Sequence, residues 1–570
     1  MFRKNEQHLQ MTLFSSIHAL PEKLQKRLAA SWSGIFYQEF FVRIDEEPFA
    51  VLYSDEASRP NIPINVLVGL ETLKSGFGWS DEEMYDHFRY DVQVRYALGY
   101  RDLSEGHFEL RTVYNFRQRV TRHMQETGEN LIEAAFEQVT DEQIAAFELK
   151  TNKLRMDSTL IAGNIRKMSR IQLLVEVLQR VHRMLTEQDR QRYADEFAPY
   201  LKGSSGQYIY HIKGGESEAH LRRIGELMQH LLVALVDTYA DKACYQVLER
   251  VFREHFVSQE NELQVKAGSE LSSGSLPSPD DGQATYRQKR GQGHQGYVAN
   301  VTETCDPDNP FQLIVKMQTE PNNTDDAAML AEALPGLTDR MDVEQIDTDG
   351  GYNSPQVDTA MREHHVVQIQ TAIRGRKPAP EKLGLEDFAW NTNAEGHPQT
   401  VTCPHGQQSV VTSARKEFRY RATFLTPDCQ QCPLLAQCPT QTLKRKPEQL
   451  LRFSQAELDL ALRRQRCAEA RTRTQNLRPA VEATVRAVKH PFGNGKVPVR
   501  GQARVSMLLI GSAAMNNVRQ ITRYLASKTK KGANGGSLDP CTSLFRSLSS
   551  RLAAYLNSAS LFEHVWTCQF

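Results

Sequence analysis

The chain has no long hydrophobic run and few cysteines. No apolar stretch in its 570 residues approaches the roughly 18 to 20 residues that a membrane-spanning helix requires. Residues 1–6 lead into no apolar stretch of the kind found in a secretory signal. Nine cysteines are too few for a scaffold held together mainly by disulfides. We therefore expect a cytoplasmic protein that does not contact a membrane.

The chain also lacks a net charge, because 69 Lys and Arg balance 69 Asp and Glu. The charge is unevenly distributed, since residues 441–531 contain 20 Lys and Arg against 5 Asp and Glu. A basic segment in an otherwise acidic chain is typical of a protein that contacts a phosphate backbone. A solvated helical surface would have the same composition, so charge alone leaves both interpretations open.

Hydrophobic periodicity predicts helices throughout residues 1–150, including one that begins at a capping box of Ser80 and Glu83. Period-two alternation then predicts strands, separated by a long helical stretch and by a helix after Asp325. These strands are expected at 153–161, 296–304, 312–319, 345–349 and 366–373. Strands and helices in this order predict an α/β core interrupted by insertions.

The same pass along the chain predicts five segments. They are a helical N-terminal domain at 1–150, the first part of the core at 151–375 with a helical insertion at about 165–285, an irregular cysteine-containing insertion at 376–445, the last part of the core at 446–527, and a flexible linker and tail at 528–570. The last segment is assigned to a linker because it begins with lysines and a Gly-Gly pair.

Two aspartates lie at predicted strand ends. Asp157 belongs to the segment Arg155-Met156-Asp157-Ser158-Thr159, and Asp349 follows a short strand and precedes two glycines. Glycines at such a position allow the backbone and a substrate to approach closely. Asp347 points to the same face as Asp349 and is the alternative candidate for the same role. Taken singly, Asp157 could equally be a turn or cap residue.

A glutamate lies on a later predicted helix. Arg478 precedes Glu482 by one turn, and Lys489 follows it by about two turns. A carboxylate among cations could be only a surface ion pair, which contributes little to stability. Divalent ions are held by carboxylates brought together from separate elements, and phosphodiester chemistry uses such ions. Together with the two strand-end aspartates, Glu482 therefore predicts an acidic metal site for cutting nucleic acid.

These three segments resemble those of DDE transposases of bacterial insertion sequences, most closely the insertion sequence 1182 family. The second aspartate of these proteins lies in an Asp-small-Gly-Tyr motif, which is similar to Asp349-Gly350-Gly351-Tyr352. The first aspartate matches Asp157. The resemblance implies an α/β fold with an RNase H-like catalytic core and helical insertions, preceded by an all-helical N-terminal domain that binds DNA ends.

The third motif of these transposases is Tyr, two residues, Arg, three residues, Glu, six residues, Lys. Arg478, Glu482 and Lys489 match its spacing, whereas the Tyr position is Gln475. The resemblance implies that Asp157, Asp349 and Glu482 hold two Mg²⁺ (or Mn²⁺) ions and that Arg478 and Lys489 bind DNA phosphates.

The implied function is transposition. The protein would bind the terminal inverted repeats of its element, cleave the DNA, and transfer the strand into target double-stranded DNA. Pairing two ends implies a homodimer on DNA, in the cytoplasm and associated with the nucleoid when bound. Two alternatives remain: an RNase H-like nuclease without strand transfer, and an inactive DNA-binding relic. The presence of all three carboxylates argues against the relic.

Four cysteines form a second constellation. Cys403, Cys429, Cys432 and Cys438 have the spacing C-x25-C-x2-C-x5-C, which suits a tetrahedral structural Zn²⁺. His405 is a possible substitute ligand. The alternative is a set of buried or free thiols near a loop.

Between the first two of these cysteines lies a basic run with two aromatic residues. It contains Arg415, Lys416, Phe418, Arg419, Tyr420 and Arg421. Such a run could contact a DNA backbone or stack on an exposed base. A β-hairpin with alternating faces is equally consistent with it.

Overall fold

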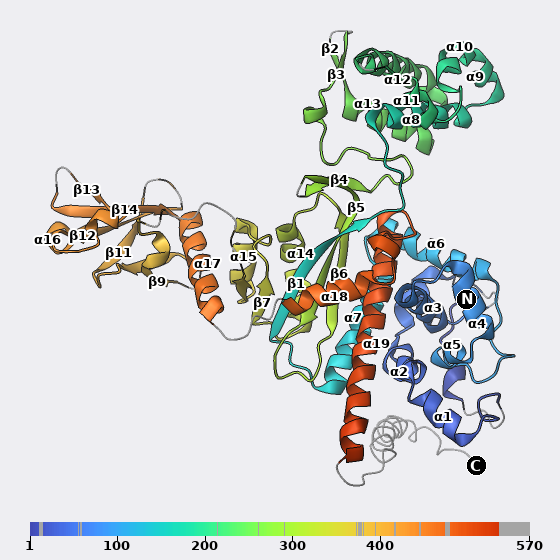
Figure 1. Ribbon diagram of the computed structural model, residues 1–570, viewed down its shortest axis with the longest axis horizontal. Helices are drawn as coiled ribbons and strands as arrows, with labels where there is room; N and C mark the ends of the chain where they lie inside the picture. Colours follow the sequence, from blue (N-terminus) through green and yellow to red (C-terminus); the bar gives the residue numbers. More distant parts are fainter. Residues whose placement is uncertain are drawn as a thin grey trace, which may run out of the picture.

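A computed structural model describes residues 1–534 apart from short gaps. These gaps are residues 11–14, 55, 57–59, 214, 260–261, 290, 372, 374–378, 380, 394, 415, 417, 444–445 and 473–478. Figure 1 shows a central sheet flanked by the N-terminal helices, with two insertions projecting from it in different directions. None of the helices in this part of the chain is long and apolar enough to cross a membrane.

The N-terminal region is helical, as predicted. Its α-helices are α1 (Glu22–Ala29), α2 (Trp32–Glu39), α3 (Ile64–Phe77), α4 (Asp81–Tyr90), α5 (Val92–Ala97), α6 (Leu110–Thr127) and α7 (Leu131–Phe147). Helix α4 begins at the predicted capping box, in which the Glu83 N–H donates to Ser80 Oγ at 3.1 Å. The Ser80 N–H donates in return to Glu83 Oε2 at 2.8 Å. Both orphan donors at this helix end are therefore satisfied.

The central sheet is mixed. Its strands are β1 (Lys153–Ala162), β4 (Thr285–Lys289), β5 (Gln292–Thr304), β6 (Ile314–Pro321), β7 (Gln345–Thr348) and β8 (Val367–Gln370). The strand order is β6-β5-β1-β7-β8, and β4 forms a hairpin with β5. The pairs β6–β5 and β5–β1 are antiparallel, and β1–β7 and β7–β8 are parallel. The sheet confirms the predicted α/β class and each predicted strand, with shifted ends.

Helices cover both faces of this sheet. Helices α14 (Asp326–Arg340) and α15 (Pro355–Glu363) pack on one face, where Leu154 and Met156 of β1 are fully buried against them. Helices α18 (Pro479–Lys489) and α19 (Gln502–Asn534) lie on the other face, where Val485 and Val488 share a core with Val301 of β5. Because successive strand residues point to opposite faces, β1 supplies apolar residues to one core and polar residues to the other side.

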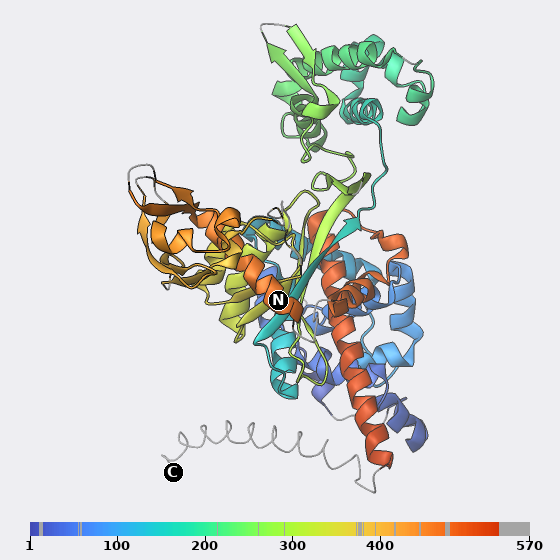
Figure 2. The same ribbon diagram turned by 60° about the vertical axis from the view of Figure 1, so that its left-hand side comes forward.

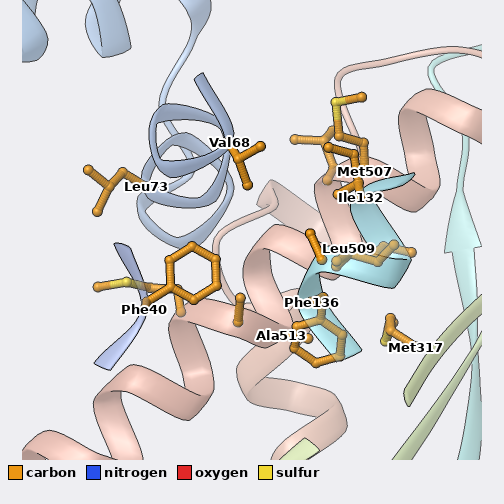
Figure 3. Close-up of a cluster of buried hydrophobic side chains, with 14 of the residues drawn as sticks. Phe40, Val68, Leu73, Ile132, Phe136, Met317, Met507, Leu509 and Ala513 are labelled. Atoms are coloured by element: carbon orange, nitrogen blue, oxygen red, sulfur yellow. The ribbon is translucent and has the colours of Figure 1, made fainter. Parts of the chain in front are cut away.

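Helix α19 joins the sheet to the N-terminal helices. Figure 3 shows Leu509 and Ala513 of α19 between Val68 of α3, Phe136 of α7 and Met317 of β6. The contact between α3 and α19 is tight, since a Cβ added at Gly76 would lie 2.3 Å from Met515 Cγ. The N-terminal helices therefore have no separate core, because they share one with a helix near the other end of the chain.

Helix α19 is also longer than expected. It continues through Lys528 to Asn534, where the sequence predicts a flexible linker from residue 528. Lys528 Nζ lies 4.6 Å from the centroid of the Tyr524 ring, one turn earlier. Lysine, alanine and serine tolerate a helix, so the single Gly532 does not end it. The remainder of the predicted tail, from residue 535, lies outside the described residues.

The first insertion separates β1 from β4 and projects from one end of the sheet (Figures 1 and 2). It contains α8 (Arg170–Met184), α9 (Glu187–Arg192), α10 (Ala194–Phe197), α11 (Ser205–Tyr210), α12 (Ser217–Tyr239), α13 (Ala243–His255) and the hairpin of β2 (Phe256–Gln259) and β3 (Glu262–Val265). Its buried apolar residues form a core of their own, which includes Leu174, Met228 and Leu248.

The second insertion is a β-sheet, not the irregular segment predicted. Its strands are β9 (Ala389–Thr392), β10 (Pro398–Thr402), β11 (Gln408–Ser413), β12 (Arg419–Leu425), β13 (Gln441–Thr442) and β14 (Glu448–Ser454), in the order β13-β14-β12-β11-β10-β9. The short helix α16 (Thr426–Gln430) follows β12, and α17 (Gln455–Thr472) leads back toward the central sheet. Most of these strands are short and rich in polar residues, so few of them show the alternation of apolar and polar residues that predicts a strand.

The shared core around α19 predicts a large cost for truncating it. Leu509 is 0% exposed, so Leu509→Ala should lower the free energy of unfolding by about 2 to 5 kcal/mol. Urea denaturation followed by circular dichroism measures this loss. The matched control is Val233→Ala at a residue 75% exposed on α12, which should change stability by less than about 0.5 kcal/mol. Equal effects of the two substitutions would contradict the packing described.

Candidate active site

Asp157 lies in the middle of β1, not at a strand end as predicted, and β1 pairs in parallel with β7, which ends just before Asp349. Arg155 of β1 pairs with Asp347 of β7 in the register of these strands. Asp157 follows Arg155 by two residues on β1, and Asp349 follows Asp347 by two residues, just beyond the end of β7. Asp157 therefore lies on the same face of the sheet as Arg155. The site therefore begins at the point where β7 ends and β1 continues.

A buried tyrosine lies beneath these two aspartates. The Tyr352 hydroxyl donates to Asn300 Oδ1 at 2.7 Å, and Tyr352 is fully buried. Burial raises the pKa of Tyr352 well above its usual value, and the charges of Asp326 and Asp157 raise the pKa further. Asp349 itself accepts a hydrogen bond from the Gly351 N–H at 2.6 Å, which fixes the turn between β7 and this tyrosine.

Asp347, the alternative to Asp349 as a metal ligand, has a different environment. Asp347 is 7% exposed, whereas Asp349 is half-buried. Asp347 Oδ2 accepts a hydrogen bond from Gln345 Nε2 at 2.7 Å. Burial, followed by the charge of Asp347, raises the pKa of the Cys305 thiol to about 12. Asp347 thus lies inside the protein, while Asp349 lies nearer the surface.

Glu482 approaches Asp157 from α18. The two residues line one pocket of about 550 Å³, together with Arg486, Lys489 and His490. Glu482 is exposed and lies in the first turn of α18, where the helix dipole favours a negative charge. The structure therefore brings two of the three predicted carboxylates to a single pocket, with the third at the adjoining strand end.

A buried ion pair fixes α18 to the sheet. Arg155 Nε lies 2.7 Å from Glu303 Oε1, and both side chains are buried. Thr484 Oγ1 of α18 donates to the other oxygen of Glu303 at 2.9 Å. Burial raises the pKa of the Glu303 carboxyl, and Arg155 and Thr484 favour its charged form. We refer to Arg155, Glu303 and Thr484 as the Arg155–Glu303–Thr484 tie. Arg155 lies two residues from Asp157 on β1, and Thr484 lies two residues from Glu482 on α18. No sequence motif indicated this set of contacts.

Lys489 also lines this pocket and contacts β1. Its Nζ donates to Thr159 Oγ1 at 3.1 Å and to the Leu160 carbonyl at 3.0 Å. Burial lowers the pKa of Lys489, and the nearby charge of Lys289 lowers it further. Gly495 has a φ of 65°, and a Cβ added there would lie 3.0 Å from Lys489 Cε. A glycine at this turn thus leaves room for the lysine.

Two residues of the third motif lie outside the described part of the chain, namely Arg478 and Gln475. Among the residues that are described, no group of three or more His, Cys, Asp or Glu is arranged to hold a metal ion. The donor set of Asp157, Asp349 and Glu482 nevertheless fits a hard cation in its chemistry, because such ions prefer carboxylate oxygens.

The four clustered cysteines line one small pocket with His405. Cys403 lies in the turn between β10 and β11, and the Gln407 N–H donates to its Sγ at 3.3 Å. Burial raises the pKa of Cys429, and charge on Cys438, Cys403 or Cys432 would raise it further. The thiols therefore share one environment, although they form no metal-holding group in the residues described.

The basic run beside these cysteines is part of a strand with alternating faces. Arg419 and Arg421 are exposed on β12, whereas Tyr420 and Phe424 are buried. Phe418 precedes the strand, is 56% exposed, and has a φ of 57°. The structure thus shows the alternating hairpin that the sequence left as one of two interpretations.

Comparisons with known proteins identify two parts of the chain. The family described as Transposase DDE domain matches residues 402–522, and the family described as Transposase domain (DUF772) matches residues 26–119. The first match contains Glu482 and Lys489 but neither aspartate. It implies an RNase H-like core, in agreement with the strand order of the central sheet. No curated protein and no solved structure matches the chain.

The Arg155–Glu303 pair predicts an asymmetric response to mutation. Arg155→Met leaves a buried carboxylate without its cation and should lower the free energy of unfolding by about 3 to 5 kcal/mol. Arg155→Met/Glu303→Leu should recover most of this loss. Urea denaturation of the three proteins measures both effects, and a single variant as stable as the double variant would refute the role of the pair.

The pH dependence of the single variant has a defined sign. The pKa of Glu303 is already raised in the folded protein, so the folded state binds its proton more readily than the unfolded state. Arg155 favours the charged form of Glu303, so Arg155→Met raises this pKa further, and the variant gains more stability from proton binding than the wild-type protein does. The stability deficit of Arg155→Met should therefore shrink as pH falls below neutrality and grow as pH rises, as urea denaturation at a series of pH values would measure.

Proposed function

Because this chain is a DDE-type insertion-sequence transposase, we propose that it binds the terminal inverted repeats of its element, cleaves the DNA there, and transfers the freed strand into target DNA. Membership of the insertion sequence 1182 family stays a prediction. The observation that carries the proposal is the convergence of Asp157 and Glu482 on one pocket. Asp349 follows β7, the strand that pairs with β1.

We assign the metal-binding role to Asp157, Asp349 and Glu482. Bound divalent ions, Mg²⁺ or Mn²⁺ and two in number, would supply activation of a water or a DNA 3′-hydroxyl and charge stabilisation on the leaving oxygen. The protein's own contribution is to position the carboxylates. Two of them are held on rigid elements, β1 and α18, that the buried Arg155–Glu303–Thr484 tie fixes to each other.

Lys489 and Arg478 are the proposed phosphate-binding residues. Lys489 is held at the mouth of the pocket by two hydrogen bonds to β1, so its ammonium group lies beside the residues that flank Asp157. An ammonium group in this place would attract the phosphates next to the reacting one. Arg478 lies just before α18, and its assignment follows from the motif spacing alone.

The remaining parts of the proposal concern domains and partners. The helical domain at 1–150 would contact the DNA ends, and the region matched as a transposase domain lies within it. Two ends must be held together for transfer, so the active species would be a homodimer on double-stranded DNA. The protein would work in the cytoplasm, on the nucleoid.

For the cysteine pocket, we propose a structural Zn²⁺ held by Cys403, Cys429, Cys432 and Cys438. Support comes from the shared pocket and from the position of these residues, which lie on connections of the second sheet rather than in its strands. Thiolate ligands in a set of four suit tetrahedral zinc. Binding would require loss of the thiol protons, so affinity would fall as pH decreases.

The first test separates the two neighbouring aspartates. Asp349→Asn should bind a duplex from the element end as tightly as the wild-type protein and abolish cleavage, because it removes one of the three proposed metal ligands. Asp347→Asn should keep cleavage, because Asp347 is buried and bonded within the protein. A gel assay with labelled DNA and Mg²⁺ measures both properties.

The reverse result, in which Asp347→Asn is inactive and Asp349→Asn cuts normally, would overturn the assignment. Cleavage by wild-type protein without joining to a target duplex would favour a nuclease over a transposase. Binding without any cleavage by the wild-type protein would favour a DNA-binding relic.

The zinc proposal predicts about one equivalent of zinc in protein purified without chelator, as measured by elemental analysis. Cys432→Ser should lose this zinc and lower the unfolding temperature. Cys244→Ser, at a half-buried cysteine on α13, is the matched control and should keep the metal. Wild-type protein free of zinc after growth in zinc-supplemented medium would refute the proposal.

A further inference from the structure

A second pocket continues directly from the candidate active site. Its volume is about 1090 Å³, and it shares Ser158, Thr159, Lys489 and Gly495 with the pocket that contains Asp157 and Glu482. The two pockets therefore form one path along the surface of the sheet, with carboxylates at one end. We refer to the larger part as the basic groove.

The walls of the basic groove come from three separate parts of the chain. They are the end of β1 with the following connection to residue 167, the hairpin of β4 and β5, and the turn after α18. The last of these is fixed to β1, because Lys496 forms a bridge with Ala162 and the Val497 N–H donates to the Ala162 carbonyl at 3.1 Å. The groove is thus built from core elements rather than from one loop.

Of the residues that the structure describes, five cations and no acidic residue line this groove. They are Arg166, Lys167, Lys289, Lys489 and Lys496. Of these, Arg166 has an acidic partner, Glu176, at 3.5 Å. Over the described part of the chain, Lys167, Lys289 and Lys496 are exposed and form no ion pair. The effect of Lys289 on the pKa of Lys489 shows that charges from different walls influence one another.

Like charges that converge without counter-charges repel one another, and a bound polyanion would relieve this repulsion. Among the described residues, His294 is the only aromatic side chain that lines the groove, so this part of the chain offers no stacking platforms for successive bases. Lysine ammonium groups bind phosphates as point charges and carry no sequence information when they do so. The lining therefore suits the backbone of a nucleic acid rather than its bases.

We propose that the basic groove holds the DNA that extends from the carboxylate pocket, through its phosphates and independently of its sequence. This inference rests on the proposed function and adds a place for the part of the substrate that is not the terminal repeat. Sequence-independent contact suits DNA that differs from one insertion to the next, which is the flanking or target DNA, whereas the repeats themselves must be read by other surfaces.

The test replaces the three unpaired lysines. Lys167→Gln/Lys289→Gln/Lys496→Gln should weaken DNA binding and reduce the slope of log affinity against log salt concentration by roughly 2 to 3, because each lost phosphate contact removes about 0.9 for duplex or 0.7 for single-stranded DNA. The matched control is Lys202→Gln/Lys213→Gln/Lys242→Gln, which removes three exposed lysines of the first insertion that do not line the groove and should leave the slope unchanged.

Fluorescence anisotropy in the absence of divalent ions provides the readout, so the result does not depend on cleavage. Two duplexes of equal length are compared, one that carries the element end with its flank and one of unrelated sequence. Both should lose affinity equally in the groove variant. An unchanged slope, or a loss confined to the duplex with the element end, would overturn the proposal.

The outcome also separates this inference from the proposed function. Wild-type protein that never cuts, combined with a reduced slope in the groove variant, would leave the groove as a DNA-binding site and refute the transposition chemistry. Wild-type protein that cuts, combined with an unchanged slope, would refute the groove and leave the active site intact. Circular dichroism of both triple variants confirms that each is folded before binding is compared.

Discussion

The alternation of β1 is the constraint on which the site depends. Its even-numbered residues Leu154 and Met156 are buried under α14 and α15, so its odd-numbered residues must face α18. On that face a charged residue is tolerated only when it is paired, and Arg155 meets this condition through Glu303. Glu303 also accepts a hydrogen bond from Thr484, which fixes the distance between α18 and the sheet. The position of Glu482 relative to Asp157 follows from the packing of residues that are not themselves catalytic.

The two insertions leave this arrangement undisturbed because each has a hydrophobic cluster of its own. The first has its own apolar core and projects away from the sheet, and the second is a separate sheet connected through α17. Each can therefore vary without changing the register of β1 and β7. The groove is the exception, since the connection that leads into the first insertion forms one of its walls.

Much of the core could be predicted from the sequence, because its strands alternate and its helices have clear caps, as at Ser80 and Asp325. The carboxylates were found through their motifs, and the register of β1 with β7 could not have been derived from either strand alone. The second sheet was missed because polar positions dominate its short strands, although β12 alternates fully once its partners are known. The groove was missed for a related reason: Lys167, Lys289 and Lys496 lie in three distant segments, and no local pattern connects them.

The sharing of one core between α19 and the N-terminal helices has a consequence for synthesis of the chain. Helices α3 and α7 end at Phe77 and Phe147, far ahead of the start of α19 at Gln502, and the faces that they pack against α19 stay uncovered until residues around Leu509 emerge. A chain terminated early would lack both the cover for these helices and Glu482. Folding of the first domain is therefore coupled to completion of the last part of the core, and incomplete chains would be substrates for proteolysis rather than competitors of the full-length protein.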